Sequence, residues 1–392
     1  MKTRNQFLKV LRGLALLFAV SLVSCKNIVN EAETIYIDPA TATEKTNWKE
    51  VLDTTYLKMV VLETSEECLI GEIHKIIYED DMLIIADIMS ASVLFFNTDG
   101  KFLHKICKIG RGPGEYTELT DICVKDGKVW LLDNISCQVI CYDYTGKMLH
   151  KFDTQGGITI QALDNSVLIG DVWGGVAAGG PYLLSEYDFD GNQLGRYLEY
   201  SELDEYRDNG EWRQFSGADN KSTNFLLTSK DEVWHYRKGE VYLKYRFDLG
   251  KYTMPEKYKL EGTEYIVRNR LQNEYGFGVI SIWESSLYQF ARIHIQGDKY
   301  LCILNKDDNS IISLSKSMSI DVFNLSGGTL NKTDGDYLLS YHSGITLYQL
   351  YEYIWKPNPE TVKGENIDLY EISKTMSADD NGVVVMMKLK NK

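Results

Sequence analysis

Three aspartates are the residues whose type and spacing most suggest a metal site. Asp87 and Asp133 occupy matching places in two similar stretches, each directly after an apolar run, and Asp171 has a comparable place further on. Carboxylate oxygens are ligands that Ca²⁺ prefers, so a ring of them around a channel could hold this ion. The same carboxylates could instead accept hydrogen bonds from the amides of their own turns. We expect this structural role, with the Ca²⁺ site as the alternative.

A glycine-rich segment, Gly110-Arg111-Gly112-Pro113-Gly114, precedes Glu115. It does not match the G-x-x-x-x-G-K-[ST] loop and does not open a helix, which argues against nucleotide binding. We expect a tight crossing between two sheets, in which Arg111 pairs with Glu115. Exposed loops on rigid scaffolds often carry binding residues, so Arg111 and Glu115 are also candidate ligand-binding residues.

A second candidate binding segment spans residues 171–182 and carries Trp173 and Tyr182 among several glycines. Aromatic side chains with a polar group suit sugars and peptides as ligands. The alternative is a long hairpin that packs on its neighbour. Trp173 and Tyr182 are therefore candidate ligand-binding residues.

No set of residues in the sequence predicts catalysis. The chain has 6 His but no H-x-H, H-E-x-x-H or G-x-S-x-G pattern. We therefore expect a binding module without a cofactor rather than an enzyme. The alternative is a metal-dependent lyase or hydrolase, with its site at the mouth of a channel and Ca²⁺ as the metal.

An internal repeat defines the elements that must position these residues. Residues 82–105 align with residues 128–151 at an offset of 46, and residues 185–198 form a third copy. Each copy contains short apolar strands joined by polar turns at Asp-Gly or Thr-Gly. About four strands in a unit of about 45 residues indicate one blade of a β-propeller.

The predicted fold is all-β: a six-bladed propeller of four-stranded antiparallel blades over residues 51–392, with seven blades as the alternative. Propellers often close their ring by pairing strands from the two ends of the chain, which leaves no open edge. Residues 55–63 and 382–390 are the candidate closing strands. A short helix is expected at Thr263–Tyr275.

The N-terminal residues resemble a bacterial lipoprotein signal. A basic start precedes an apolar run of 11 residues at 13–23, too short to span a bilayer, which needs about 20. The run ends in Leu-Val-Ser-Cys, similar to a lipobox. We expect residues 1–24 to be removed, Cys25 to be lipidated and residues 25–50 to form a polar tether. A plain signal peptide with an incidental Cys25 is the alternative.

Charge and cysteine content limit the partners. The net charge of −14 and the lack of a basic stripe argue against nucleic acid. The expected partners are the bacterial membrane, through the lipid, and an envelope protein or a carbohydrate or peptide ligand. Cys137 and Cys141 would lie about 13 Å apart along one strand, too far for a disulfide. We expect free thiols at the cysteines that follow Cys25: Cys68, Cys107, Cys123, Cys137, Cys141 and Cys302.

Residues 83–133 resemble the NHL repeat, which runs from an apolar strand through Ala-Asp, a turn, a strand and Asp-Gly to a glycine-rich crossing. Residues 109–116 and 242–255 are similar to segments of the six-bladed propeller lipoproteins of Bacteroidetes. The resemblance implies a six-bladed propeller, export with a lipid anchor, which we expect in the outer membrane, and an interaction role. It implies no established chemistry.

Overall fold

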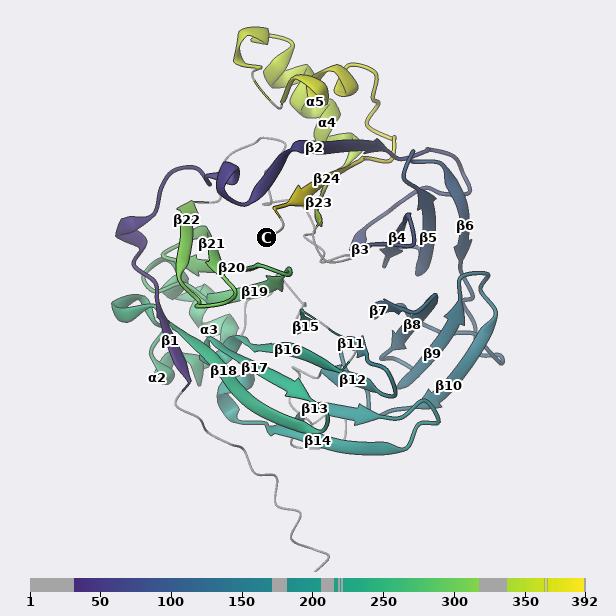
Figure 1. The fold of residues 1–392 in the computed structure, drawn as a ribbon, viewed down its shortest axis with the longest axis vertical. Coiled ribbons are helices and arrows are strands. Elements are labelled where there is room, and N and C mark those ends of the chain that lie inside the picture. The colour runs from purple at the N-terminus through teal and green to yellow at the C-terminus, as the bar shows by residue number, and fades with distance from the viewer. Residues whose placement is uncertain are drawn as a thin grey trace, which may run out of the picture.

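The computed structural model describes residues 32–170, 182–205, 215–217, 219, 221–316, 337–362, 364 and 366–390. These residues form six β-sheets, most of them four-stranded. The sheets are arranged as blades around a central axis (Figure 1). The predicted six-bladed propeller is therefore confirmed.

The first three blades contain the sequence repeats, and each is an antiparallel sheet of four consecutive strands. The first blade comprises β3 (Ile73–Glu79), β4 (Met82–Asp87), β5 (Ser92–Asn97) and β6 (Phe102–Ile106). The second comprises β7 (Asp121–Lys125), β8 (Lys128–Asp133), β9 (Gln138–Asp143) and β10 (Met148–Asp153). The third comprises β11 (Thr159–Ala162), β12 (Val167–Gly170), β13 (Tyr182–Tyr187) and β14 (Gln193–Glu199). The first strand of each blade lies nearest the axis (Figure 1).

The fourth and fifth blades continue this plan with less regular sequences. The fourth comprises β15 (Phe215–Ser216), β16 (Ser222–Leu227), β17 (Glu232–Arg237) and β18 (Glu240–Asp248). The fifth comprises β19 (Gly278–Glu284), β20 (Tyr288–Ile295), β21 (Asp298–Asn305) and β22 (Ile311–Lys316).

The sixth blade joins the two ends of the chain. In order, β2 (Leu52–Val61), β24 (Val383–Leu389) and β23 (Tyr337–His342) form one sheet. Val61 pairs with Val383 and Leu52 pairs with Leu389. The predicted closing strands thus do pair, and they join the two ends of the chain in one blade.

The first described strand lies inside the predicted tether. Strand β1 (Glu33–Tyr36) pairs in parallel with β18, with Glu33 opposite Tyr245. Ile35 and Ile37 are each 4% exposed and join the apolar core between the fourth and fifth blades. Ile35 and Ile37 are buried, whereas Tyr36 between them is exposed, as in a strand laid on a core. Part of the segment predicted to be a tether, residues 33–37, is therefore packed against the ring.

The core is divided into seams between neighbouring blades. Ile84 and Phe95 of the first blade pack with Ile122 and Leu131 of the second, and all four are fully buried. Each blade thus presents apolar side chains to both neighbours, so the ring is held by burial of apolar surface.

The Asp-Gly and Thr-Gly positions of the repeats are hairpin turns, as predicted. Gly100 and Gly146 have φ of 80° and 79°, values that glycine adopts at no steric cost. A Cβ at Gly100 would lie 1.9 Å from the carbonyl oxygen of Val61 in the closing strand. Gly100 is therefore required both by its turn and by the seam between the sixth and first blades.

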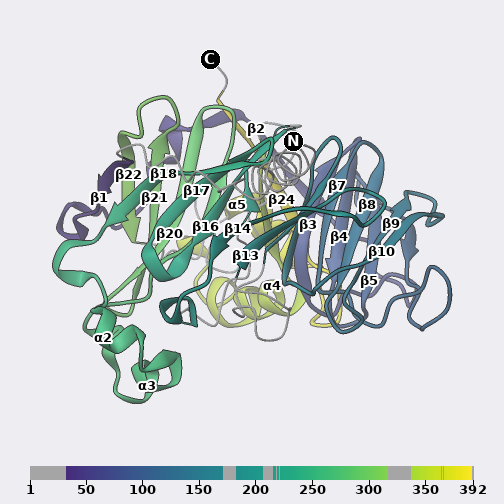
Figure 2. The same ribbon diagram turned by 90° about the horizontal axis from the view of Figure 1, so that it is seen from below.

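Two helical insertions interrupt the blades. Helices α2 (Glu256–Lys259) and α3 (Gly262–Arg268) separate β18 from β19, and α4 (Gly344–Leu350) and α5 (Asn366–Ser373) separate β23 from β24. The side-chain oxygen of Ser343 caps α4 by accepting from the amide of Thr346 at 3.3 Å. Figure 2 shows α2, α3 and α4 on the same side of the ring. The helix expected at Thr263–Tyr275 corresponds to α3 and a following 3₁₀ turn.

The remaining helical turns are short. They are η1 (Pro39–Thr41), η2 (Trp48–Glu50), η3 (Glu202–Glu205), η4 (Thr228–Lys230), η5 (Gly250–Tyr252), η6 (Leu271–Asn273), the π-helical η7 (Tyr351–Trp355) and η8 (Pro359–Thr361). Within the part of the chain that the structure describes, no helix has the length and apolar character needed to cross a membrane.

Candidate functional site

The ring has two faces that differ in the connections they carry. We call the face at which β3, β7, β11 and β19 begin the crossing face, because the chain passes from one blade to the next there. The face at which these strands end is the far face. Asp87, the last residue of β4, pairs with Ile73 at the start of β3. The turns after β4 and β8 therefore lie on the crossing face.

The carboxylate of Asp87 is fully buried and holds this face together. It accepts from the amides of Gly71 (3.0 Å), Glu72 (2.9 Å) and Met89 (3.0 Å) and from the hydroxyl of Ser90 (2.7 Å). Two of these donors belong to the incoming crossing and two to the turn of Asp87 itself. The carboxylate therefore joins the crossing to the turn.

Asp133 has the same arrangement in the second blade. It accepts from the amides of Thr117 (2.7 Å) and Ser136 (2.9 Å) and from the side-chain amide of Gln138 (3.1 Å). Burial opposes its ionisation, but the hydrogen bonds from Ser136 and Thr117 outweigh it and hold the pKa of this carboxyl below its usual value. Both repeated aspartates thus have donors around them that fit a carboxylate in a turn.

The Ca²⁺ alternative gains no support from this geometry. Among the described residues, no group of three or more His, Cys, Asp or Glu side chains is arranged to hold a metal ion. Asp171 lies outside the described residues. The three-aspartate site therefore stays a prediction.

The glycine-rich crossing of residues 110–116 is a small, internally bonded loop. Glu115 accepts from the amide of Gly112 at 2.7 Å, and Gly110 donates to the carbonyl of Tyr116 at 2.9 Å. Arg111 is exposed at its tip. Among the ion pairs of the described residues, none joins Arg111 to Glu115. The expected Arg111–Glu115 pair is absent, because Glu115 instead closes the loop on its own backbone.

Exposed apolar side chains lie in the turns and crossings on the crossing face of the first two blades. Met89 is 72% exposed and Ile135 is 70% exposed, at equivalent places in the two repeats. Ile109, in the crossing itself, is 58% exposed, and Leu69, in the preceding crossing, is 51% exposed. We call these four residues, together with Arg111, the crossing-face patch.

The other predicted binding segment is described only at its end. Tyr182 begins β13, is half-buried and pairs with Glu199. Trp173 lies outside the described residues. The suggestion that they bind a ligand together therefore stays a prediction.

A buried carboxylate near the axis, missed from the sequence, joins three blades. Asp121 of β7 is 1% exposed. It lies 2.5 Å from the Nζ of Lys75 and 3.1 Å from the Nε2 of His74, both on β3. It also accepts from the hydroxyl of Thr159 (2.9 Å) and the amide of Ile160 (3.0 Å), both on β11. Burial opposes ionisation, but Lys75 and His74 outweigh it and hold the pKa of Asp121 well below its usual range.

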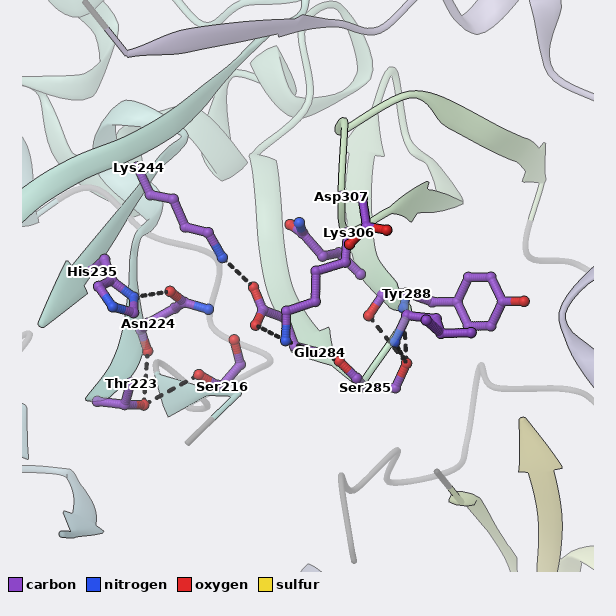
Figure 3. Close-up of polar contacts among 12 residues, drawn as sticks. Ser216, Thr223, Asn224, His235, Lys244, Glu284, Ser285, Tyr288, Lys306 and Asp307 are labelled. Atoms are coloured by element: carbon purple, nitrogen blue, oxygen red, sulfur yellow. Dashed lines mark hydrogen bonds and ion pairs between the residues drawn. The ribbon is translucent and has the colours of Figure 1, made fainter. Parts of the chain in front are cut away.

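A second buried carboxylate lies on the far face, between the fourth and fifth blades. Glu284 is the last residue of β19 and is 3% exposed. The Nζ of Lys244, on β18, lies 2.5 Å from its Oε1, and the Nζ of Lys306, just after β21, lies 3.2 Å from its Oε2. Figure 3 shows both lysines directed at the carboxylate from opposite sides. We call these three residues the Lys-Glu-Lys cluster.

A neutral histidine lies beside this cluster on β17. Burial, assisted by the positive charge of Lys244, lowers the pKa of His235 from its usual value. Its Nδ1 lies 2.8 Å from the Oδ1 of Asn224. An amide oxygen can only accept, so Nδ1 carries the proton and Nε2 is left as an acceptor.

Two buried polar atoms near Glu284 have no hydrogen-bond partner among the described residues: the Oγ of Ser216 and the Oε1 of Gln289. These residues are only 8% and 1% exposed. Gln289 pairs with Glu284 across β19 and β20, so the two side chains lie on one face of the sheet. A Cβ at Gly217, next to Ser216, would lie 2.4 Å from the Oε2 of Glu284. Both atoms are therefore close neighbours of the Lys-Glu-Lys cluster.

Sequence patterns did not reveal this cluster because its members come from separate segments with no common spacing. One local signal was present: Glu284 ends a strand, GVISIWE, whose other residues are all buried. A charged residue in a buried strand is rarely found without a partner. The partners themselves could be found only from the fold.

The six cysteines after Cys25 are free thiols in the structure, as expected, and four of them are buried. Burial raises the pKa of Cys123, Cys141 and Cys302 to about 12. These thiols are therefore not in the reactive thiolate form at neutral pH.

Comparisons with known proteins identify a family and support the fold. A family model described as "Domain of unknown function (DUF4934)" matches residues 34–388. A crystal structure of a "Putative exported protein" from Bacteroides fragilis has a TM-score of 0.67 and 16% identity, over 91% of this chain and 100% of that chain. A member of the DUF4221 family from Bacteroides vulgatus has a TM-score of 0.51 and 11% identity, over 85% of this chain and 96% of that chain. No curated protein matches the chain. At such identities the two structures support the shared fold and nothing further.

Proposed function

We propose that this chain, which belongs to the DUF4934 family, is an exported, lipid-anchored propeller. It binds another protein of the cell envelope through the crossing-face patch. The family description assigns no activity. The proposal therefore rests on the chain's own residues.

The observation that carries the proposal is the exposure of apolar side chains and of Arg111 on rigid loops of one face of the ring. Ile109 and Arg111 project from a crossing that is bonded to its surroundings at several points. The hydroxyl of Tyr116 donates to the carbonyl of Ala91 (2.6 Å), and that of Tyr142 donates to the carbonyl of Gly114 (2.9 Å). A preformed loop loses little conformational freedom on binding. Exposed apolar side chains with a central arginine are typical of protein interfaces.

Export and anchoring are supported by the N-terminal residues. A basic start, a short apolar run and Leu-Val-Ser-Cys25 form a lipoprotein signal pattern. The protein of similar fold from Bacteroides fragilis is itself described as "Putative exported protein". Because a bacterial lipoprotein carries more than one acyl chain, its attachment to the membrane is stable. The partner would then be a protein of the same envelope, presenting apolar side chains and a carboxylate for Arg111.

Site-specific photocrosslinking in native membranes tests this proposal. A photoreactive residue at position 109 should give a discrete adduct with one envelope protein, and Arg111→Glu should abolish that adduct. Position 311 is the matched control, since Ile311 is also an exposed apolar residue (42%) but lies on the fifth blade. The proposal fails if position 109 gives no adduct, if position 311 gives the same adduct, or if Arg111→Glu leaves the adduct unchanged.

A further inference from the structure

We infer that the Lys-Glu-Lys cluster on the far face is a binding site for a small hydroxy acid, a ligand with a carboxylate and at least one neighbouring hydroxyl. This site is separate from the crossing-face patch. It would give the propeller a small-molecule ligand in addition to its protein partner.

The cluster has more cationic donors than Glu284 uses. Each lysine ammonium has three N–H donors. Among the described residues, the Nζ of Lys244 donates to Glu284, while that of Lys306 contacts Glu284 and donates to the carbonyl of Ser285 at 3.1 Å. Donors therefore remain on both lysines, and each side chain is partly exposed, at 24% and 32%. Two positive charges against one negative charge favour an anion, and a carboxylate can accept from both ammonium groups.

Asp307 is a further carboxylate close to the cluster in the sequence. It follows Lys306 directly and is exposed. In Figure 3 its carboxylate lies on the other side of Lys306 from Glu284. The lysine side chain is directed inward, toward the carboxylate that it shares with Lys244.

The two unpartnered buried atoms call for a ligand that also carries a hydroxyl. The Oε1 of Gln289 is an acceptor and the Oγ of Ser216 can donate or accept. Leaving such groups unpaired in a protein interior is costly, so native structures almost always pair them. A hydroxyl next to the ligand carboxylate could donate to Gln289 and exchange a hydrogen bond with Ser216. The neutral His235 supplies one further acceptor, its Nε2.

The cluster lies toward the axis of the ring. Ser216 and Glu284 end two neighbouring innermost strands, β15 and β19, so they lie at the axial side of the seam between the fourth and fifth blades (Figure 1). The central channel of a propeller is a common place for a ligand.

Isothermal titration calorimetry of the purified protein with glycerate and glucuronate tests the inference. Their neutral counterparts, glycerol and glucose, are the matched ligand controls. We expect heat of binding from at least one of the two acids and none from either neutral compound. Lys306→Met should weaken that binding about tenfold or more, the usual effect of losing a charge-assisted hydrogen bond. Lys306→Met retains the Lys244–Glu284 ion pair, so the variant should fold.

Two further variants locate the site. Ser216→Ala should weaken binding of the acid without affecting the circular dichroism spectrum. Lys316→Met is the matched control, because Lys316 also holds a carboxylate, that of Asp298 at 2.8 Å, but lies outside the cluster; this variant should bind like the wild type. The inference is overturned if neither acid binds, if acid and neutral compound bind equally, or if Lys306→Met and Lys316→Met have the same effect. None of these outcomes bears on the crosslinking at position 109, so the two proposals can fail separately.

Discussion

Replacing Asp121 tests whether one buried carboxylate joins the first three blades at the axis. The side chain of Lys75 is only 16% exposed in the wild type. In Asp121→Ala its ammonium group loses the carboxylate, and Thr159 and Ile160 lose their hydrogen-bond acceptor. Removing one partner of a buried ion pair costs about 3–5 kcal/mol, and we expect a loss of this size. Asp121→Asn keeps one acceptor oxygen but no charge, so its cost should be about 1.5–3 kcal/mol, that of a hydrogen bond to a charged group.

Urea unfolding followed by tryptophan fluorescence gives the free energy of unfolding of each variant from the midpoint and slope of the transition. Asp143→Ala is the matched control. The carboxylate of Asp143 also accepts several hydrogen bonds, from Thr145 (2.9 and 2.7 Å) and Lys147 (2.9 Å), but in an exposed turn where water can replace it. Its midpoint should shift less than that of either Asp121 variant. Adding Lys75→Met to Asp121→Asn should restore part of the loss, because no unpaired charge then remains buried.

The pH dependence supplies an independent check. The pKa of Asp121 is lower in the folded protein than in the unfolded chain, because Lys75 and His74 outweigh the effect of burial. Its contribution is therefore complete above about pH 4 and is lost as the pH falls below that value. The stability difference between the wild type and Asp121→Asn should begin to shrink below about pH 4. The reasoning is refuted if Asp121→Ala costs no more than Asp143→Ala, or if that difference stays constant down to pH 2.

Three other variants give direct tests. Burial raises the pKa of Asp231 to about 6, so the folded protein takes up a proton there before the unfolded chain does. The wild type should therefore gain stability relative to Asp231→Asn as the pH falls from 7 to 5; an equal slope in urea titrations of both proteins would contradict this. Gly100→Ala should lower the melting temperature measured by calorimetry, because the new Cβ would meet the carbonyl of Val61. Gly127→Ala is the control: Gly127 also has a positive φ, but a Cβ there would meet nothing within 4 Å. Cys25→Ala should move the protein from the membrane to the soluble fraction, and unchanged fractionation would refute lipidation.

The fold could be predicted from the sequence because its requirements recur in each blade. Asp87 and Asp133 lie 46 residues apart because each carboxylate bonds the crossing that enters its blade. The turn glycines, Gly100 and Gly146, recur because the same left-handed backbone recurs. Even the closing strands could be identified, since a ring must pair the two ends of its sheet array.

Other features could not be predicted because each depends on contacts that occur once in the ring and do not recur from blade to blade. Strand β1 adds a fifth, parallel strand to the fourth blade, and nothing in residues 33–36 distinguishes it from a polar segment with two apolar residues. The expected Arg111–Glu115 pair was wrong, and the carboxylate of Glu115 instead accepts from the amide of Gly112. A choice between a side-chain donor and a backbone donor depends on the path of the loop, which spacing alone does not determine.

Some buried carboxylates recur at the same place in the repeats, and others occur only once in the ring; this difference bears on function. A residue that the blade requires should recur in each blade, as Asp87 and Asp133 do. A residue that recurs nowhere has to be explained by its own place in the ring. Strand β3 ends on Glu79, which is partly exposed, β7 ends on Lys125 and β11 on Ala162. Strand β19 instead ends on a buried glutamate held by two lysines. Burying such an ion cluster gains little stability over apolar packing, and the seams between the blades are filled mainly by apolar side chains. Asp121 also occurs only once, but the donors it binds on the neighbouring blades account for its presence. Glu284 differs because two buried polar atoms without partners, in Ser216 and Gln289, lie beside it. The small-molecule site is therefore placed at Glu284 and not at the repeated aspartates.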